Sequence, residues 1–301
     1  MLYLRRRRPQ VLLALDTRAN RIAVRAKRWF GERLDVWPSL RNALPKPDND
    51  RHATRQLRTL RSIAEGCDGI IAISQGLADE FRSLTGADSA HVHVIHNPVV
   101  NDVLRAKLEA SVSHPWLTAN RQVPVVLTVA RLEPQKDLKT LLRAIAVLNE
   151  RCPCRLLVIG EGKEAAALAS LAADLGVADQ VDWLGFQINP YAYMKQADLF
   201  VLSSRSEGFG NVLVEALAAG VPVVSTRCPH GPLEILADGR YGALVPVGDW
   251  RALAAAMATT LAKPPSVEIL RQRAEVFTME RCGARYMQVL GLQEAADGRE
   301  R

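Results

Sequence analysis

Two glutamates that stand eight residues apart, Glu207 and Glu215, are the first candidates for chemistry in this sequence. Between them lies the glycine-rich stretch GFGN, residues 208–211, which leads into an apolar run. A glycine-rich turn before a helix lets a ligand approach the backbone and presents N–H groups to an anion. A carboxylate accepts hydrogen bonds from neighbouring hydroxyl groups. The pattern therefore indicates a phosphate site flanked by sugar hydroxyls, although Glu215 taken alone is explained as well by an exposed helix position.

Two cations, Arg131 and Lys136, form a second candidate group. They follow the apolar run VPVVLTVA and precede a segment with helical spacing that starts at Asp137. Cations at the carboxyl end of a strand suit a pyrophosphate, because guanidinium and ammonium groups make charge-assisted hydrogen bonds to it. The alternative is that both side chains pair with surface carboxylates.

Strands and helices alternate regularly from residue 123 onwards. Continuous apolar strands between helices are typical of a parallel sheet that is covered on both faces. The pattern predicts a doubly wound α/β domain, in which ligands bind beyond the carboxyl ends of the strands. We expect its strands over 123–130, 154–160, 181–185, 198–204, 221–227 and 242–247.

The first hundred residues show the same alternation less completely. We expect strands over 10–16, 69–74 and 92–99, helices over 17–30, 51–65 and 75–86, and a linker over 99–122. The predicted domains are a partial Rossmann-like domain over 1–100 and a second Rossmann-like domain over 101–265. Residues 266–301 are predicted to be C-terminal helices, the last of which packs back on the N-terminal domain.

The positive charge is concentrated in the first fifth of the chain. Residues 1–61 hold 16 Lys and Arg against 5 Asp and Glu, whereas the other 240 residues hold 23 against 27. Such asymmetry indicates an anionic partner. The stretch carries no aromatic interleaving and no nucleic-acid motif, so an anionic membrane surface is favoured over nucleic acid. A solvated helix face is the plain alternative.

The amino-acid composition limits the classes of protein to which the chain can belong. The chain is 48% hydrophobic and 24% charged, as in soluble globular proteins, and no apolar run approaches 18 residues. Its five cysteines are odd in number and scattered, so a disulfide framework is not expected. We expect a cytoplasmic protein that is peripheral on the inner face of the cytoplasmic membrane.

Several segments together resemble one known family. The segment RSEGFGNVLVEALAAGVPVVST resembles the E-x7-E element of the retaining GT-B glycosyltransferases of the GT4 family, and VARLEPQKDLKTLLRA resembles their phosphate-binding segment. The segments LLVIGEG, VDWLGF and GPLEILADGRYGALVPVGD occur in the family's order. The resemblance implies a GT-B-like α/β fold with two Rossmann-like doubly wound domains facing across a cleft, the N-terminal one incomplete. It also implies that the domain over 1–100 is the acceptor and membrane side and that the domain over 101–265 binds the nucleotide sugar.

The resemblance also implies roles for the candidate residues. Arg131 and Lys136 would hold the donor diphosphate, Glu215 the ribose hydroxyls and Glu207 the donor sugar. The remaining donor-binding positions are Gly208, Phe209, Gly210 and Asn211 through their backbone, Val212 and Leu213 through their N–H groups, and Gly185 and Phe186 near the base. No metal and no cofactor are implied, because cations and a helix terminus take the place of a metal.

The expected activity is retaining transfer of a hexose or N-acetylhexosamine from a UDP-sugar. The acceptor would be a glycan or lipid-linked saccharide in cell-surface polysaccharide or lipopolysaccharide synthesis. UDP is favoured because CPHGPLEIL resembles segments of enzymes that use UDP-hexoses and UDP-N-acetylhexosamines.

The start of the sequence departs from the family. Family members open with a strand and a glycine-rich loop, whereas the first glycine here is Gly31. From the size of a two-domain α/β chain, roughly 70–100 residues of the usual N-terminal domain are expected to be missing. A non-catalytic remnant that binds a nucleotide sugar is therefore the alternative to an active transferase.

Overall fold

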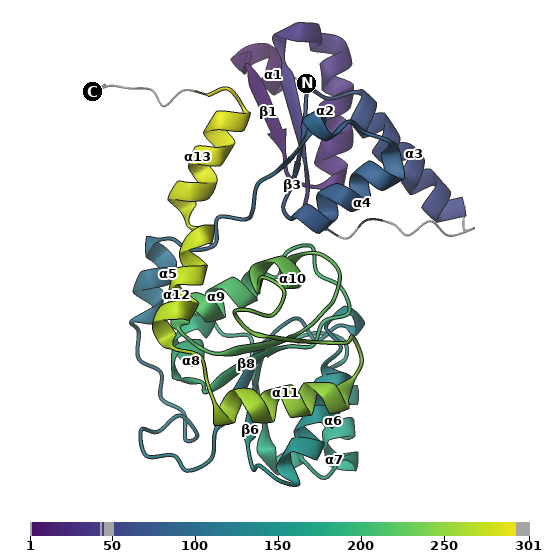
Figure 1. Ribbon diagram of the computed structural model, residues 1–301. Coiled ribbons are helices and arrows are strands. Elements are labelled where there is room, and N and C mark those ends of the chain that lie inside the picture. The colour runs from purple at the N-terminus through teal and green to yellow at the C-terminus, as the bar shows by residue number, and fades with distance from the viewer. Residues whose placement is uncertain (1, 43, 45–50, 293–301) are drawn as a thin grey trace. The chain divides into compact units, whose positions relative to one another are not determined.

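The computed structural model describes residues 2–42, 44 and 51–292 and divides into two compact units (Figure 1). One unit runs to Asn97 and includes the C-terminal segment from Glu280 onwards. The other unit spans Pro98–Met279. Within the described ranges, no helix is both long enough and apolar enough to cross a membrane.

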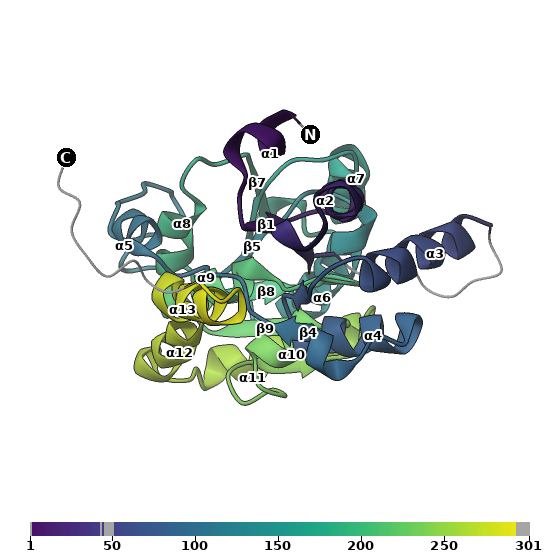
Figure 2. The ribbon, with the colours of Figure 1, turned by 90° about the horizontal axis from the view of Figure 1, so that it is seen from above.

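The N-terminal unit is built on a parallel sheet, which within the described residues has the order β1-β2-β3-β4. Because each strand pairs with the next along the chain, right-handed crossovers place the connecting helices on one face. These helices, α2, α3 and α4, lie side by side (Figure 2). The strands are β1 (Val11–Ala14), β2 (Asp35–Leu40), β3 (Ile70–Ala72) and β4 (Val92–Val94), and the helices are α1 (Leu2–Arg7), α2 (Thr17–Phe30), α3 (Arg51–Glu65), α4 (Gln75–Thr85) and α13 (Met279–Val289).

Helix α2 begins directly after β1 because Asp16 caps it. The Asp16 carboxylate accepts hydrogen bonds from the N–H groups of Arg18 and Ala19 at 2.7 and 2.8 Å. Such a cap satisfies donors that the first turn leaves unpaired and contributes about 1 kcal/mol. The buried Ala23 and Val24 of α2 then pack in one cluster with Val36 of β2.

Strand β2 does not follow from the sequence pattern. Pro38 lies within it, and proline normally argues against an interior strand because it has no N–H to donate. The structure accommodates it because Pro38 is aligned with Ala14 of β1, while β2 pairs with β3 through Ser39 and Leu40. Burial of this segment overrides its weak strand propensity.

The C-terminal unit is a doubly wound α/β domain, as predicted. Its described parallel sheet has the order β10-β9-β8-β5-β6-β7. Helices α6, α7 and α11 cover one face and α8, α9 and α10 the other (Figure 1). The strands are β5 (Val125–Val129), β6 (Arg155–Ile159), β7 (Val181–Gly185), β8 (Leu199–Leu202), β9 (Val223–Thr226) and β10 (Ala243–Val245), and the helices are α5 (Asp102–Leu108), α6 (Leu138–Asn149), α7 (Ala165–Asp174), α8 (Pro190–Gln196), α9 (Asn211–Ala219), α10 (Gly231–Ile235), α11 (Trp250–Ala262) and α12 (Val267–Ala274).

The central strands of this sheet are inaccessible to solvent. Leu127 of β5, Leu157 of β6 and Phe200 of β8 are all 0% exposed. Strands buried on both faces read as continuous apolar runs, which is why the sequence predicted them well. Helix α5 is different: it lies within the segment 99–122 that we expected to be a linker, and Asn101 caps it through a 2.9 Å bond to the Leu104 N–H.

Candidate functional site

The two predicted site segments start at neighbouring points of the C-terminal sheet. From β5 the chain continues outward through β6 and β7, and it then returns to β8 on the other side of β5. Open parallel sheets bind ligands at such a reversal, beyond the carboxyl ends of the strands. The loop 130–137 follows β5 and the loop 203–210 follows β8, so the fold itself brings the two segments together.

Several hydrogen bonds join these two loops. The Arg205 N–H donates to the Gln135 carbonyl at 2.8 Å, and the Gln135 side-chain amide donates to the Ser206 carbonyl at 2.7 Å. The Ser203 hydroxyl donates to the Lys136 carbonyl at 2.8 Å. The loops therefore hold their functional side chains in a fixed relation to each other.

Lys136 and Glu207 form an ion pair at the centre of this region. The Lys136 Nζ lies 2.6 Å from Glu207 Oε1, and the two side chains are 16% and 10% exposed. The buried Ser204 hydroxyl also donates to Glu207 Oε1 at 2.6 Å. A carboxylate that is mostly withdrawn from water needs such partners, since an unpaired buried charge is strongly unfavourable.

Arg131 is placed differently. Its guanidinium is 68% exposed and pairs with Glu133 at 2.9 Å rather than with a group of the second loop. An exposed pair of this kind contributes little stability. The side chain is consequently held less firmly than Lys136, and the structure does not bring it into the Lys136–Glu207 cluster.

The GFGN turn is fixed by close packing. The ring of Phe209 is 2% exposed and packs edge-on against Phe277 with centroids 5.5 Å apart, so only its backbone can contact a ligand. A Cβ at Gly231 would lie 1.7 Å from the Phe209 carbonyl oxygen, which means that only glycine fits there. Gly210 precedes α9 with φ +96°, a conformation that glycine adopts without strain.

Helix α9 begins at Asn211, after this turn. The Leu213 N–H donates to the Gly210 carbonyl at 2.9 Å, so this predicted phosphate ligand already has an intramolecular partner. Val212 occupies the same first turn. The predicted anion site therefore depends on the backbone around 208–212 more than on the Leu213 N–H.

Glu215 lies one turn further along α9. Burial raises the pKa of its carboxyl to about 7 from an ordinary value of 4.5. Among the described residues no hydrogen-bond donor contacts this carboxylate. The carboxylate also interacts electrostatically with Tyr191 of α8. The pKa of Tyr191 is raised chiefly by burial and additionally by the negative charge of Glu215. Glu215 is thus a half-buried acid whose neighbourhood favours the neutral form until a donor group binds it.

Gly185 ends β7 and Phe186 follows it, and β6 separates this strand from β5. Gly185 has φ +63°, and the Phe186 ring is 72% exposed. The Phe186 N–H donates to the Glu161 carboxylate at 3.3 Å. An exposed aromatic ring at the carboxyl edge of the sheet can stack on a planar ligand.

Other residues near the Lys136–Glu207 pair were not predicted. His230 has φ +77° and forms an isolated parallel bridge with Glu207. Cys228 is buried; desolvation raises its thiol pKa to about 12, with a further contribution from the Glu207 charge. The positive φ of a non-glycine residue signals a constrained position, but the sequence gives no indication of it. Within the described part of the chain, no group of three or more His, Cys, Asp or Glu side chains is arranged to hold a metal ion.

The architecture is the GT-B-like fold that the sequence predicts. A similar solved structure is that of Alr3699/HepE from Anabaena in complex with UDP, with a TM-score of 0.79 and 22% sequence identity. The similarity covers 94% of this chain and 79% of the other. At this level of identity it defines the fold.

The sequence assigns the family. Residues 114–277 match the model of the glycosyl transferases group 1, and residues 3–103 match that of glycosyltransferase family 4. The chain therefore belongs to the glycosyl transferases group 1 family.

Two curated relatives are similar over different fractions of the chain. The lipopolysaccharide core biosynthesis glycosyltransferase LpsE of Rhizobium meliloti is 31% identical over 84% of this chain. The N-acetylgalactosamine-N,N'-diacetylbacillosaminyl-diphospho-undecaprenol 4-alpha-N-acetylgalactosaminyltransferase of Campylobacter jejuni is 36% identical over 45% of this chain. The matches span 66% and 37% of the lengths of these relatives.

Proposed function

We propose that this chain transfers a hexose or N-acetylhexosamine from a UDP-sugar to a lipid-linked or polysaccharide acceptor, with retention at the anomeric carbon. The observation that carries the proposal is the Lys136–Glu207 ion pair at the reversal point of the C-terminal sheet, together with Glu215 one turn into the helix that follows Glu207. A cation, a carboxylate and a half-buried acid at that edge match the three parts of a nucleotide sugar. These parts are the diphosphate, the sugar and the ribose.

The proposed chemistry assigns a task to each group. Lys136 and Arg131 neutralise the negative charge that develops on the leaving diphosphate, without a metal ion. Glu207, held by Lys136 and Ser204, accepts hydrogen bonds from hydroxyls of the transferred sugar. The acceptor hydroxyl attacks from the face that the nucleotide leaves, and its proton passes to the leaving phosphate.

UDP is proposed as the nucleotide on two grounds. The segment CPHGPLEIL places Cys228 and His230 beside Glu207 and resembles segments of UDP-sugar users. The structurally similar Alr3699/HepE was solved in complex with UDP, and also with UDP-glucose. Phe186 would lie near the base, where its exposed ring is available for stacking.

The proposed acceptor follows from the relatives and from the basic N-terminal unit. The R. meliloti relative is named for lipopolysaccharide core biosynthesis and the C. jejuni relative for a diphospho-undecaprenol substrate. Helices α1 and α2 expose apolar side chains, with Tyr3 70%, Ile22 57% and Trp29 74% exposed. Apolar side chains among arginines suit the surface of an anionic membrane, where such acceptors are anchored.

Donor binding is tested by thermal stabilisation with UDP, GDP and their common sugars. We expect a shift with UDP that disappears in Glu215→Ala, because a ligand that binds only the folded state raises its melting temperature. Glu150→Ala, an exposed carboxylate at the end of α6, is the matched control and should retain the shift. No shift with any of these nucleotides contradicts the proposed donor site.

Turnover is tested with radiolabelled UDP-hexoses and UDP-N-acetylhexosamines, with lipid acceptors or water. Glu207→Ala should abolish transfer while UDP still binds, since Glu207 is assigned to the sugar and not to the nucleotide. Equal loss of UDP affinity in Glu207→Ala and Glu215→Ala would contradict this division of roles. Binding without any turnover would favour the non-catalytic alternative.

A further inference from the structure

Asp137 follows Lys136 directly and has an unusual backbone conformation. Its φ and ψ are +47° and +46°, in the left-handed region that residues other than glycine seldom adopt. The position is also buried, because Asp137 is 4% exposed. A strained residue of this kind persists only when the surrounding structure holds it in place, so its contacts show what it does.

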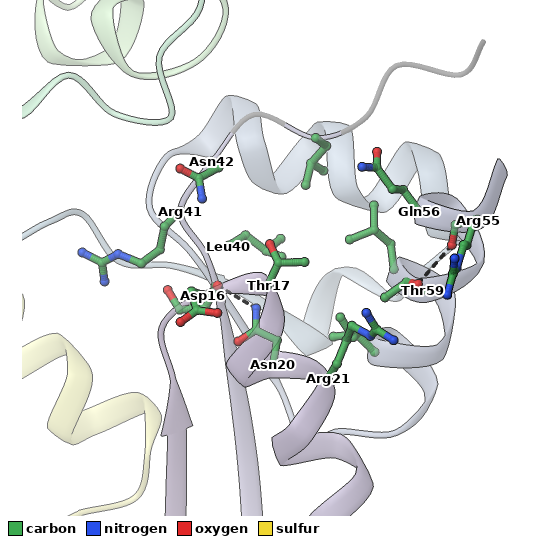
Figure 3. A pocket seen from close by; sticks show the side chains of 14 residues that line it. Asp16, Thr17, Asn20, Arg21, Leu40, Arg41, Asn42, Arg55, Gln56 and Thr59 are labelled. Carbon is green, nitrogen blue, oxygen red and sulfur yellow. Dashed lines mark hydrogen bonds between the residues drawn. The ribbon is translucent and has the colours of Figure 1, made fainter. Parts of the chain in front are cut away.

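Asp137 does not act as an ordinary helix cap. Asp16 at the start of α2 (Figure 3) shows the usual arrangement, with an extended backbone and a carboxylate that accepts the N–H groups of Arg18 and Ala19. Among the described residues at the start of α6, none donates a backbone N–H group to the Asp137 carboxylate. The left-handed turn at Asp137 therefore needs a different explanation.

The Asp137 carboxylate binds side chains of α6 and of the loop after β8. Its Oδ2 accepts a 2.9 Å hydrogen bond from the buried hydroxyl of Thr140, in the first turn of α6. The same oxygen lies 3.1 Å from Nε of Arg205, in the loop 203–210. A buried carboxylate needs such partners, and these two hold it between the helix and the second loop.

The backbone of Lys136 is held on both sides next to this turn. Its N–H donates to the Glu133 carbonyl at 2.9 Å, and its carbonyl accepts the Ser203 hydroxyl at 2.8 Å. Asp137 then turns the chain into α6, while the Lys136 Nζ lies 2.6 Å from Glu207 Oε1. Another backbone conformation at Asp137 would change the direction of the chain and displace Lys136 from this contact.

Two ion pairs join the same two loops at neighbouring positions. Asp137 comes one residue after Lys136, and Arg205 comes two residues before Glu207. A lysine side chain is long and flexible, so a single ion pair does not fix its ammonium group. The Asp137–Arg205 pair supplies a second connection that restricts the backbone from which this side chain extends.

We propose that Asp137 is a positioning residue for Lys136 and acts through it without touching the ligand. Its carboxylate holds the left-handed turn through Thr140 and Arg205, and the turn directs the Lys136 ammonium toward Glu207. The consequence for donor binding rests on the proposed function, in which Lys136 contacts the diphosphate. The positioning itself does not depend on that function.

Acylation of lysine amines by an N-hydroxysuccinimide ester, followed by mass spectrometry, tests the positioning without any nucleotide. The paired Lys136 side chain is 16% exposed and should react slowly, and the exposed Lys163 is the internal reference. Asp137→Gly keeps the left-handed backbone without strain and removes the carboxylate. We expect it to raise the rate at Lys136 about fivefold relative to Lys163, because the amine is then paired for less of the time.

Two further variants separate positioning from a general loss of stability. Asp137→Asn should react as slowly as the wild type, since asparagine tolerates the left-handed conformation and keeps an oxygen for the Thr140 hydroxyl. Asp249→Ala removes the cap of α11 in the same unit, where Asp249 accepts the Ala252 N–H at 2.9 Å, and should leave the Lys136 rate unchanged. Equal Lys136 rates in Asp137→Gly and the wild type would overturn the proposal.

A double-mutant cycle with UDP tests the consequence for donor binding. Asp137→Gly should weaken UDP binding about tenfold when Lys136 is present and less than about twofold in Lys136→Ala, since the effect passes through Lys136. Equal weakening with and without Lys136 would show that Asp137 acts by another route and would overturn the proposal. A wild-type chain that does not bind UDP contradicts the proposed function alone, because the acylation rates still decide the positioning.

Discussion

At the scale of single residues, the candidate site combines two kinds of carboxylate. Glu207 has a cation 2.6 Å away and a hydroxyl donor at the same distance. Glu215 has neither, and burial raises its pKa to about 7. The first carboxylate already has a cation and a hydroxyl donor as partners, whereas the ionised form of the second is favoured only when hydroxyl groups donate to it.

Glu215 makes the free energy of unfolding depend on pH in a predictable direction. Its pKa is about 7 in the folded chain and about 4.5 when exposed, so between these values the folded state binds more protons. The stability that its neutral form contributes is fully present below pH 4.5 and is lost as the pH rises through 7, by about 1–3 kcal/mol. Urea titrations at pH 5, 6, 7 and 8 should show this fall in the wild type and not in Glu215→Gln.

Nucleotide affinity should change in the opposite direction. The ionised carboxylate is the better acceptor for ribose hydroxyls, so UDP affinity should increase as the pH rises from 6 to 8. Glu215→Gln should make that profile flat. A wild-type profile as flat as that of the variant would show that Glu215 does not contact the ligand.

At the scale of elements, the start of α9 depends on its contact with the start of α10. Gly231 allows the backbone of α10 to touch the Phe209 carbonyl, while the Phe209 ring is buried against Phe277. The conformation of the GFGN turn is therefore fixed by contacts with residues outside the turn, namely Gly231 and Phe277. This is how a loop rich in glycine, which is flexible in isolation, can present its N–H groups in one arrangement.

Gly231→Ala should displace this turn. The added Cβ would lie 1.7 Å from a backbone oxygen that has no flexible end to move, so we expect destabilisation by about 2 kcal/mol or more and loss of UDP binding. Melting temperatures and UDP titrations measure both effects. Gly283→Ala in α13, where the Cβ would meet no atom within 4 Å, is the control and should not lower stability. Unchanged UDP affinity in Gly231→Ala would mean that the turn does not position the donor.

Some helices and strands could be predicted from the sequence and others could not. Buried strands such as β5 and β8 follow from continuous apolar runs, and α2 follows from Asp16 and its spacing. Strand β2 could not be predicted because Pro38 weakens the pattern and only pairing with β1 and β3 stabilises it. The candidate site residues Glu207 and Glu215 were recognisable from their spacing, whereas Ser204 and His230, the partners that the structure gives to Glu207, were not, since nothing in their types distinguishes them.

At the scale of the whole molecule, charge is distributed unevenly along the chain. The first 61 residues carry the entire positive surplus, and the remaining residues are slightly acidic. Part of that surplus lines the pocket that Figure 3 shows and a groove between α2 and α3. Another part lies on exposed arginines of α1 and α2, among exposed apolar side chains.

Binding to lipid vesicles should depend on the basic residues near the N-terminus. We expect the chain to sediment with phosphatidylglycerol vesicles and not with phosphatidylcholine vesicles, and salt should weaken the association. The combined variant Arg18→Glu, Arg25→Glu and Trp29→Ala should reduce binding at least tenfold, since each basic residue contributes about 1 kcal/mol near such a surface. Arg143→Glu with Arg151→Glu, which changes the charge by the same amount on the C-terminal unit, should not. Equal losses in the two variants would show an effect of net charge alone.

The sequence by itself determined the alternation of strands and helices in the C-terminal unit and the asymmetric distribution of charge. It also indicated the family and singled out Glu207 and Glu215 as candidate site residues. These features are local in the chain or depend on spacing, so they can be recognised without a third dimension. The tertiary structure decided that Lys136 pairs with Glu207 across two loops, that Arg131 stands apart, and that Asp137 meets Arg205 of the second loop. Such relations join residues distant in sequence, and parallel strand order alone brings their side chains together.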